Sequence, residues 1–271
     1  MNNTILNVEN LSVTIDEKKI LDSITFSIER STINAVLCPN NGGKTTLIKA
    51  ISGIIYSNDG IVSLDNIVLS KNNLDKFIVK ISTILDDIEN QFIFNKVDEE
   101  LQFPLDNLSY EIKDKKKLID EVVNLTKIST DLGKSIFELS YVEKIKVLIA
   151  ASIIHKPCLL LIDDIFRFLK IKEKKEILKI LKNINEKLNI TILFTTSDLN
   201  DVIDFKNIIL LNNGKIEMQD SFDNIIFNDN ELSKIGFQIP LMIDLSRKLQ
   251  FYNLVDKIYY DPDKVVDKLW N

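Results

Sequence analysis

The residues with the clearest chemistry form a short run between an apolar segment and a helical one. Residues 33–37 predict a buried strand, and residues 47–51 predict the helix that follows. The run between them resembles G-x-x-x-x-G-K-[ST], with a cysteine where the first glycine should be. In that motif, backbone N–H groups and the positive end of the helix surround phosphates. The sequence therefore predicts a nucleotide-phosphate loop, with an ordinary Asn-Gly-Gly turn as the alternative, made of Cys38, Pro39, Asn40, Asn41, Gly42, Gly43, Lys44, Thr45 and Thr46.

Two side chains of this loop and a distant aspartate are expected to meet at the bound nucleotide. Lys44 is expected to reach the β- and γ-phosphates, and the Thr45 hydroxyl to ligate Mg²⁺. A second apolar run, residues 159–162, ends at Asp163 and Asp164, as a buried parallel strand would. Ligands gather at the carboxyl ends of such strands. Asp163 is thus predicted to hold Mg²⁺ through water opposite Thr45, and an exposed carboxylate pair is the alternative.

The elements expected around these motifs belong to an α/β protein. Alternating segments between residues 4 and 30 predict a small antiparallel sheet. Further strands are expected at 61–69, 81–85, 159–163, 191–195 and 208–211, with helices over much of 97–152 and over 172–188. Residues 220–271 predict short helices without chemistry of their own. Strands that alternate with helices indicate a mostly parallel core sheet.

Composition excludes several classes of protein. The 271 residues are 45% hydrophobic and 27% charged, which is ordinary for a globular chain. A net charge of −6 argues against a nucleic-acid binder. No run approaches the roughly 18 apolar residues of a membrane span, and the first residues lack a secretion leader. We therefore expect a cytosolic protein that neither inserts into a membrane nor binds nucleic acid.

The two cysteines and the single histidine have few roles open to them. Cys38 and Cys158 are expected near opposite ends of parallel strands, beyond disulfide range, so both are expected to be thiols. Cys38, at a helix N-terminus beside the phosphate site, is either a thiol of low pKa or a packing residue. His155 precedes the strand that ends at Asp163, which predicts a packing or surface histidine at the other edge of the sheet.

Leu139 and Ser140, the apolar helical face that follows them, and residues 195–198 complete a resemblance to the ATP-binding subunits of ABC transporters. In that family two ATPase domains pack head to tail, and each ATP lies between one phosphate loop and the partner's signature motif, here Leu139-Ser140. The resemblance implies a P-loop NTPase fold of the ABC type, with an N-terminal antiparallel β subdomain. It also implies ATP and Mg²⁺ as cofactors. The implied domains are an ATPase domain over residues 1–218, with a helical subdomain at about 97–152, and a helical C-terminal extension over 219–271.

Two further segments resemble one branch of this family, the energy-coupling factor ATPases of cobalt and vitamin transporters. They are residues 89–103 and residues 236–240. This implies a peripheral subunit on the cytoplasmic face of the cell membrane. Its partners would be a second ABC ATPase and a transmembrane coupling protein, and its role the uptake of a vitamin or metal ion. Phe92, Phe94 and Phe103 are expected either to line the groove for a coupling helix or to pack in the core.

Departures from the family pattern fall on the catalytic motifs. Tyr141, Val142 and Glu143 replace Gly-Gly-Gln of the signature, where glycine lets backbone N–H groups approach a γ-phosphate. Asp164 is the candidate catalytic base, one methylene shorter than the family's glutamate. A reach error of about 1 Å costs on the order of 100-fold in rate. The other departures are Ser197 for the switch histidine, Asp86 for the Gln-loop glutamine, Lys170 for the D-loop aspartate and Ile15 for the adenine-stacking aromatic. Asp86 is nevertheless a candidate Mg²⁺ ligand.

Three functions are compatible with this pattern. The preferred one is a transporter subunit that binds Mg-ATP, hydrolyses it poorly alone, and forms a heterodimer, since a homodimer would combine two damaged sites. The second is a nucleotide-binding regulator or scaffold without productive turnover. The third, a soluble ABC ATPase of translation or cofactor assembly, is disfavoured by the acidic balance and the single cassette.

Overall fold

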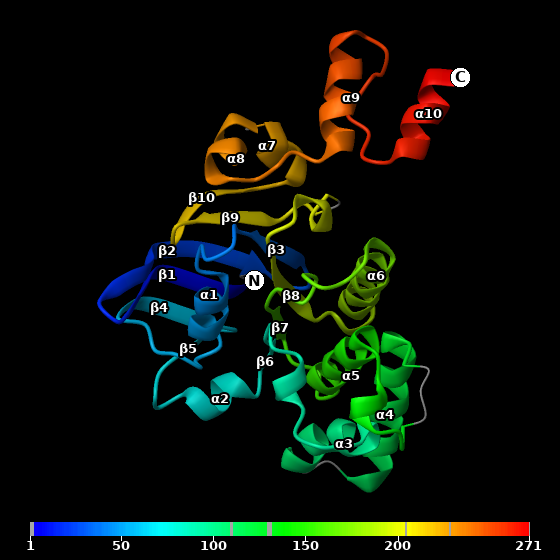
Figure 1. Cartoon of the computed structure of the whole chain (residues 1–271). Coiled ribbons are helices and arrows are strands. Elements are labelled where there is room, and N and C mark those ends of the chain that lie inside the picture. The colour runs from blue at the N-terminus through cyan, green and yellow to red at the C-terminus, as the bar shows by residue number, and fades with distance from the viewer. Residues whose placement is uncertain (1–2, 109–110, 129–131, 204, 228, 271) are drawn as a thin grey trace.

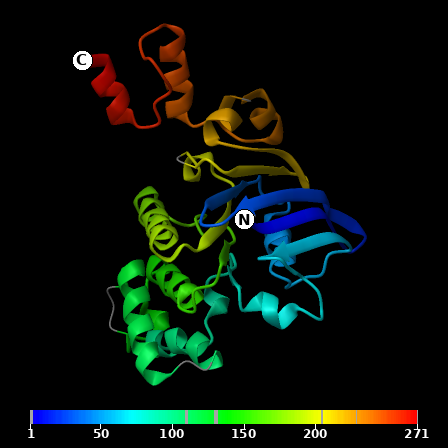
Figure 2. The ribbon, with the colours of Figure 1, turned by 180° about the vertical axis from the view of Figure 1, so that it is seen from behind.

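The computed structural model describes residues 3–108, 111–128, 132–203, 205–227 and 229–270. It contains two sheets with helices around them (Figure 1). The group of helices α3, α4 and α5 and the C-terminal helices lie at opposite ends of the molecule, as both views show (Figures 1 and 2). Among the described residues, no helix is both long and apolar enough to cross a membrane.

The smaller sheet is antiparallel and has four strands in the order β2-β1-β4-β5. Its strands are β1 (Thr4–Ile15), β2 (Lys18–Glu29), β4 (Asp59–Leu64) and β5 (Ile67–Val68). The antiparallel sheet expected from the alternating pattern near the N-terminus is therefore present, and the segment predicted at 61–69 joins it as β4 and β5.

The larger sheet has six strands in the order β10-β9-β3-β8-β7-β6, and all its pairs except β9-β10 are parallel. Its strands are β3 (Ile33–Leu37), β6 (Ile81–Ile84), β7 (Leu159–Ile162), β8 (Thr191–Thr196), β9 (Ile208–Asn212) and β10 (Lys215–Asp220). This sheet brings the ends of β3, β8 and β7 side by side, so the phosphate loop after β3 and the aspartates after β7 share one edge.

From β3 onward, helices are interspersed with the strands along the chain. The α-helices are α1 (Lys44–Ile51), α2 (Leu74–Ile78), α3 (Val97–Asn107), α4 (Ile112–Thr126), α5 (Tyr141–Ile153), α6 (Ile171–Leu188), α7 (Phe222–Phe227), α8 (Asp229–Ile235), α9 (Leu241–Phe251) and α10 (Pro262–Trp270). Three short 3₁₀ turns are η1 (Glu89–Gln91), η2 (Ile136–Glu138) and η3 (Leu199–Asp201).

Both faces of the large sheet are buried, which explains its continuous apolar strands. Successive side chains of a strand point to opposite faces. In β7, Leu159 and Leu161 enter the core shared with α1 and the antiparallel sheet, whereas Leu160 and Ile162 enter the core shared with α5 and α6. The phosphate strand and the aspartate strand are therefore clamped between two cores.

The strands and the long helix predicted from the sequence are present with ends shifted by a few residues. Strand β10 and the short helix α2 were not predicted. None of the side chains of β10 is buried, so the segment lacks the apolar signal of its neighbours. Asn213 and Gly214 both have positive φ and turn the chain directly back into β10, as in a tight hairpin.

Candidate functional site

The loop between β3 and α1 has the backbone form of an anion site. Asn41 and Gly43 adopt positive φ, at 63° and 110°, which turns the chain into the start of α1. That helix begins at Lys44 with no side-chain cap and no acidic residue in its first turn. The first N–H groups of a helix have no partner within the helix, and its dipole favours negative charge there. This end of α1 is thus suited to phosphate.

The Lys44 ammonium lies inside this loop. Its Nζ donates to the backbone oxygens of Cys38 at 3.1 Å and Pro39 at 3.4 Å. It also lies 3.6 Å from Oδ2 of Asp164, and only 7% of the Lys44 side chain is exposed. A buried ammonium held by carbonyl oxygens and one carboxylate is poised to exchange those contacts for phosphate oxygens.

Thr195, at the end of β8, connects the two aspartates and was missed by the sequence analysis. Its hydroxyl donates to Oδ1 of Asp163 at 2.7 Å and accepts the backbone N–H of Asp164 at 3.0 Å. The pairing of β7 with β8 creates this contact, with Ile162 opposite Phe194. The only sequence signal is a threonine at the carboxyl end of a strand.

Asp163 is the residue that best fits a metal ion. Its side chain is fully buried, and Oδ2 has no hydrogen-bond partner among the described residues. Burial raises the pKa of this carboxyl, against the lowering influence of the nearby Thr45 and Thr195 hydroxyls. A buried carboxylate oxygen without a partner beside a threonine hydroxyl is what a hydrated Mg²⁺ requires. The residues therefore fit this cofactor, with Thr45 and Asp163 as the groups that would hold it.

Asp86, the third predicted metal residue, lies just beyond β6 and is exposed. Strand β6 neighbours β7, so Asp86 and Asp163 share the same edge, and the charge of Asp86 contributes to the raised pKa of Asp163. Gln91 fixes the loop here, because its side-chain amide bonds both backbone groups of Leu85, at 2.8 and 2.9 Å. Direct binding of Mg²⁺ by Asp86 stays a prediction. Within the described chain, no three His, Cys, Asp or Glu side chains form a metal cluster of their own.

Cys38 packs inside the phosphate loop. Burial raises the pKa of its thiol to about 11, so it is not the thiol of low pKa that the helix end suggested. A Cβ added to Gly42 would lie 2.5 Å from Cys38 Sγ, which shows how closely the thiol fills the loop. The Cys38 side chain thus occupies the space that a side chain at position 42 would need, so the cysteine requires the glycine. Cys38 and Cys158 are both free thiols, as predicted.

Ser140 caps the N-terminus of helix α5 and is hydrogen-bonded to Glu143. The Glu143 carboxylate accepts the Ser140 N–H at 2.8 Å and the Ser140 hydroxyl at 2.7 Å. These bonds also hold the pKa of Glu143 below its usual range. Leu139 is buried, and Tyr141 packs edge-on against Phe168 with ring centroids 6.1 Å apart. Among the described residues, no hydrogen bond joins Ser140 to the phosphate loop.

The segment after β8 is tied to α6 by a charged network that the sequence analysis did not find. Lys174 donates to Asp198 at 2.8 Å and lies 2.9 Å from Asp201, whose side chain is 2% exposed. The Thr196 hydroxyl donates to Asp201 at 2.7 Å. Ser197, predicted at the switch position, lies within this segment and is half-buried. Lys174 lies in α6, whose sequence showed only an amphipathic pattern and gave no sign of this contact.

The remaining predicted residues lie in varied surroundings. Ile15 is 44% exposed at the end of β1, and Lys170 caps α6 by donating its N–H to Glu173 at 2.7 Å. His155 lies beside Ser82, with Nε2 3.4 Å from the hydroxyl, and burial lowers its pKa. That position, before β7 begins, agrees with a packing histidine at the other edge of the sheet.

Comparison with known proteins gives a consistent result. The model of the ABC transporter family matches residues 21–167, more than half of the chain. The energy-coupling factor transporter ATP-binding protein EcfA of Pediococcus pentosaceus is 28% identical over 242 residues, covering 88% of this chain and 86% of that protein. EcfA1 of Streptococcus mutans is 25% identical over 274 residues, covering 100% and 98%.

Solved structures agree on the fold. CbiO1 of Clostridium perfringens, part of the ABC transporter complex CbiONQ, superposes with a TM-score of 0.79 at 24% identity, covering 93% of this chain and 100% of that chain. The dimeric cassette MJ0796, bound to ADP and Pi, superposes with a TM-score of 0.71 at 22% identity, covering 80% and 99%.

Proposed function

This chain belongs to the ABC transporter family, and we propose that it is the ATP-binding subunit of an energy-coupling factor transporter. In this proposal it binds Mg-ATP and works in a heterodimer with a second ABC ATPase. The dimer drives a transmembrane coupling protein from the cytoplasmic face of the membrane, for uptake of a vitamin or metal ion. Residues 1–218 form the ATPase domain, with the helical subdomain at about 97–152, and residues 219–271 form the C-terminal extension.

The observation that carries the proposal is the meeting of Lys44, Asp163 and Asp164 around the uncapped start of α1. The loop supplies N–H groups and an ammonium for the phosphates, and Thr45 with Asp163 would hold Mg²⁺. Bound Mg²⁺ neutralises charge that develops on the phosphates. Asp164, 11% exposed beside the Lys44 ammonium, is positioned to orient or deprotonate an attacking water.

The segment before α3 supports a membrane-protein partner. Ile93 is 60% exposed, and the half-buried rings of Phe94 and Phe103 pack 5.5 Å apart. The backbone of this segment is fixed in place, because the buried Glu100 carboxylate accepts the N–H groups of Ile93 and Phe94, at 3.0 and 2.9 Å. A rigid loop that presents an apolar side chain beside an aromatic pair suits an incoming helix.

A second candidate function, a nucleotide-binding regulator without productive turnover, is favoured by the signature segment. The Ser140 N–H and hydroxyl both bond the Glu143 carboxylate, and the bulky Tyr141 and Val142 follow the serine. A carboxylate at this position repels a phosphate of the partner site. The two functions differ in whether any dimer that contains this chain hydrolyses ATP quickly.

Nucleotide chemistry is tested on the purified full chain. We expect Mg-ATP to bind, Lys44→Ala to weaken binding at least about tenfold because a charged hydrogen bond is lost, and hydrolysis by the single chain to be slow. Lys49→Ala, in the same helix, is the matched control. Fast, saturable turnover abolished by Lys44→Ala would show that the changed motifs do not impair catalysis.

The transporter role is tested by purifying the tagged chain from detergent-solubilised native membranes and identifying the bound proteins by mass spectrometry. Recovery of a second ABC ATPase and a protein with several membrane spans supports the proposal. If neither co-purifies and the chain is recovered alone, the regulatory function becomes the better explanation.

A further inference from the structure

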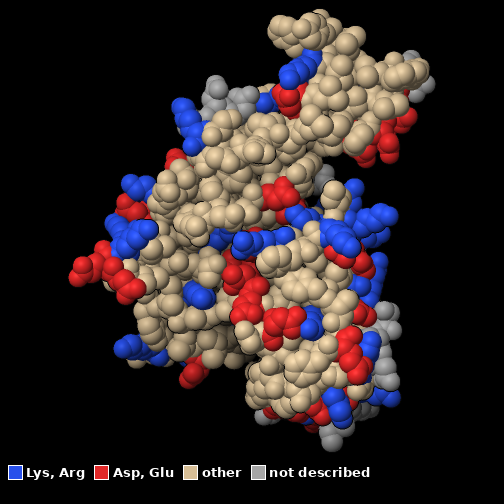
Figure 3. Space-filling view, in the orientation of Figure 1, with Lys and Arg blue, Asp and Glu red and all other residues tan. Residues whose placement is uncertain are grey.

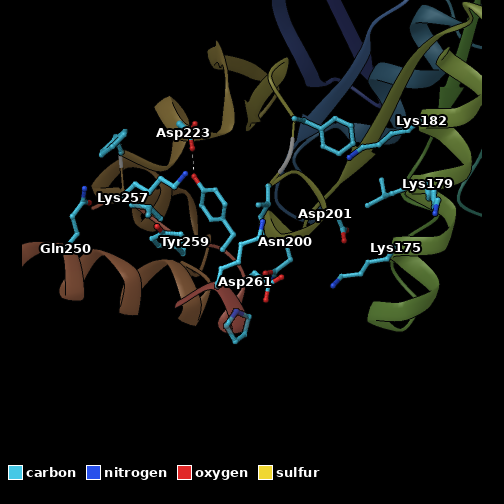
Figure 4. A pocket seen from close by; sticks show the side chains of 18 residues that line it. Lys175, Lys179, Lys182, Asn200, Asp201, Asp223, Gln250, Lys257, Tyr259 and Asp261 are labelled. Atoms are coloured by element: carbon cyan, nitrogen blue, oxygen red, sulfur yellow. Dashed lines mark hydrogen bonds between the residues drawn. The ribbon is translucent and has the colours of Figure 1, made fainter. Parts of the chain in front are cut away.

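A pocket of about 940 Å³ lies between helix α6 and the C-terminal segment, and no part of the phosphate loop lines it. It is visible as a recess below the C-terminal helices, with lysines gathered at its edge (Figure 3). One wall is α6, the opposite wall includes residues 257–264, and Asn200 and Asp201 line it between them (Figure 4). Its volume is at the upper end of the range for small-molecule sites.

Five lysines line this pocket in a protein whose net charge is −6. Lys175, Lys179 and Lys182 line the pocket from one face of α6, and Figure 4 shows Lys175 and Lys182 extending from the helix toward the C-terminal segment. Lys257 and Lys264 approach from the other wall. Among the residues that the structure describes, Lys175, Lys179 and Lys264 have no ion-pair partner.

The acidic residues of the pocket make contacts with other groups, and among the described residues none of them pairs with Lys175, Lys179 or Lys264. Asp201 is bonded by Lys174 and the Thr196 hydroxyl. Asp223 accepts the Tyr260 hydroxyl, and Asp261 accepts the backbone N–H of Asp263 at 3.0 Å. Five lysines and three aspartates line the pocket, so its lining carries more positive than negative charge, which favours an anion.

Aromatic and apolar side chains complete the lining. Phe227 is 65% exposed, and Ile203, Ile258 and Tyr259 are also among the lining residues. The Arg247 guanidinium lies over the Phe227 ring, 5.9 Å from its centroid, and the ring is otherwise exposed. A concave site with ammonium groups on two walls and an exposed aromatic ring matches a small molecule better than a broad, flat anionic surface. We propose that this pocket binds a small organic anion that carries phosphate groups and a planar ring.

Such a ligand would also touch the segment that follows β8. Asn200 and Asp201 line the pocket, and the latter is joined through Lys174 to Asp198, next to Ser197. Asp201 also accepts the Thr196 hydroxyl, and the Thr196 backbone oxygen accepts the Cys38 N–H at 3.0 Å, so hydrogen bonds lead from the pocket to the start of the phosphate loop. Binding in the pocket does not depend on the proposed transporter role.

The test is calorimetric titration of ADP and of inorganic tripolyphosphate into full-length Lys44→Ala chain, with EDTA present to suppress the loop site. We expect ADP to bind, and we expect the double variant Lys175→Gln/Lys179→Gln to weaken the binding of both ADP and tripolyphosphate at least about tenfold. Lys172→Gln/Lys187→Gln, which neutralises two lysines of α6 outside the pocket, is the matched control. Phe227→Leu should weaken the binding of ADP several-fold and leave the affinity for tripolyphosphate unchanged.

Each other outcome overturns the proposal. Absence of binding by either probe rejects a phosphate site, and binding that ignores Lys175 and Lys179 places the ligand elsewhere. A parallel flotation assay uses vesicles that contain phosphatidylserine. Vesicle binding that needs these lysines, without ADP binding, would assign the surface to a membrane instead. Circular dichroism melts of all variants separate lost binding from lost folding.

Discussion

Lys44 Nζ and Asp164 Oδ2 lie 3.6 Å apart, so the ammonium of the phosphate loop is paired with the candidate catalytic carboxylate. The two side chains are 7% and 11% exposed, which limits screening by water. A nucleotide phosphate that accepts hydrogen bonds from the Lys44 ammonium would draw this group away from Asp164. We expect this to free the carboxylate for a water molecule, so that nucleotide binding would prepare the candidate base.

Asp164→Glu is expected to raise ATP turnover by the complex with the partner ATPase. The added methylene corrects a reach error that costs on the order of 100-fold. Asp164 has a φ of 45°, a left-handed conformation that Asp tolerates better than Glu, so a small loss of stability should accompany the gain. Steady-state hydrolysis and thermal melts measure both effects, and Asp164→Asn, the isosteric control, should lose about 100-fold or more. Equal turnover by all three would remove Asp164 from catalysis.

Thr195→Val should destabilise the chain by about 1–3 kcal/mol, because it leaves Asp163 Oδ1 and the Asp164 N–H without their bond. It should also weaken Mg²⁺-dependent nucleotide binding, since Asp163 loses its orientation. Urea unfolding and titration of ADP with and without Mg²⁺ measure the two effects. Thr195→Ser keeps the hydroxyl and is expected to retain Mg²⁺-dependent nucleotide binding. If the serine variant bound nucleotide as weakly as the valine variant, Thr195 would act through packing and not through its hydroxyl.

Asp163 is expected to make the nucleotide-free protein less stable as pH rises. Burial raises the pKa of this carboxyl in the folded chain above its ordinary value of 3.8. Between these two values the folded state retains a proton that the unfolded chain has lost, so the free energy of unfolding falls as pH increases. Without Mg²⁺, Asp163→Asn should therefore be stabilising at pH 7 and less so at pH 4.

The measurement is thermal unfolding of both chains at the two pH values, repeated with Mg-ADP. Mg-ADP should stabilise the natural chain and have little effect on Asp163→Asn, because the metal needs the ionised carboxylate. Asp59→Asn, which changes an exposed carboxyl at the start of β4, controls for the loss of one charge. A pH-independent effect of Asp163→Asn would contradict the prediction.

Lys174→Met should destabilise the chain by about 3 kcal/mol, because the buried charge of Asp201 would lose its only cationic partner among the described residues and keep the Thr196 hydroxyl alone. Adding Asp201→Asn removes that charge and should recover part of the loss. Chemical unfolding of the single and double variants gives the coupling energy as a double-mutant cycle. Additive losses would show that the two residues do not act as a pair.

Tyr141→Gly/Val142→Gly with Glu143→Gln should speed hydrolysis by the purified heterodimer. Glycine removes bulk from the backbone N–H groups, and glutamine removes the charge that repels phosphate. The two glycines should cost roughly 1 kcal/mol each in the first turn of α5. Turnover of the reconstituted complex measures the gain, and no gain would favour the regulatory function.

Local pattern predicted the phosphate loop and the aspartates because one continuous stretch of sequence encodes each of them. The end of β3 follows from an apolar run that stops before Pro39, and the end of β7 from one that stops at Asp163. Thr195 and Lys174 escaped because their roles exist only once β8 pairs with β7 and α6 packs nearby. The chemistry of Cys38 was also undecidable in sequence, since burial, not the helix end, determines the pKa of its thiol.

Gly214 shows that the nucleotide site is constrained by a residue with no chemistry. Its N–H donates to the Gly42 oxygen at 3.1 Å, and its own oxygen accepts the Asp22 N–H at 2.8 Å. A Cβ added there would lie 2.0 Å from the Ile20 oxygen, so no other residue fits. One hairpin turn thus holds the phosphate loop against the antiparallel sheet while leading into β10 and the C-terminal helices. A rearrangement of that turn would therefore shift Gly42, and with it the backbone of the loop expected to hold phosphate.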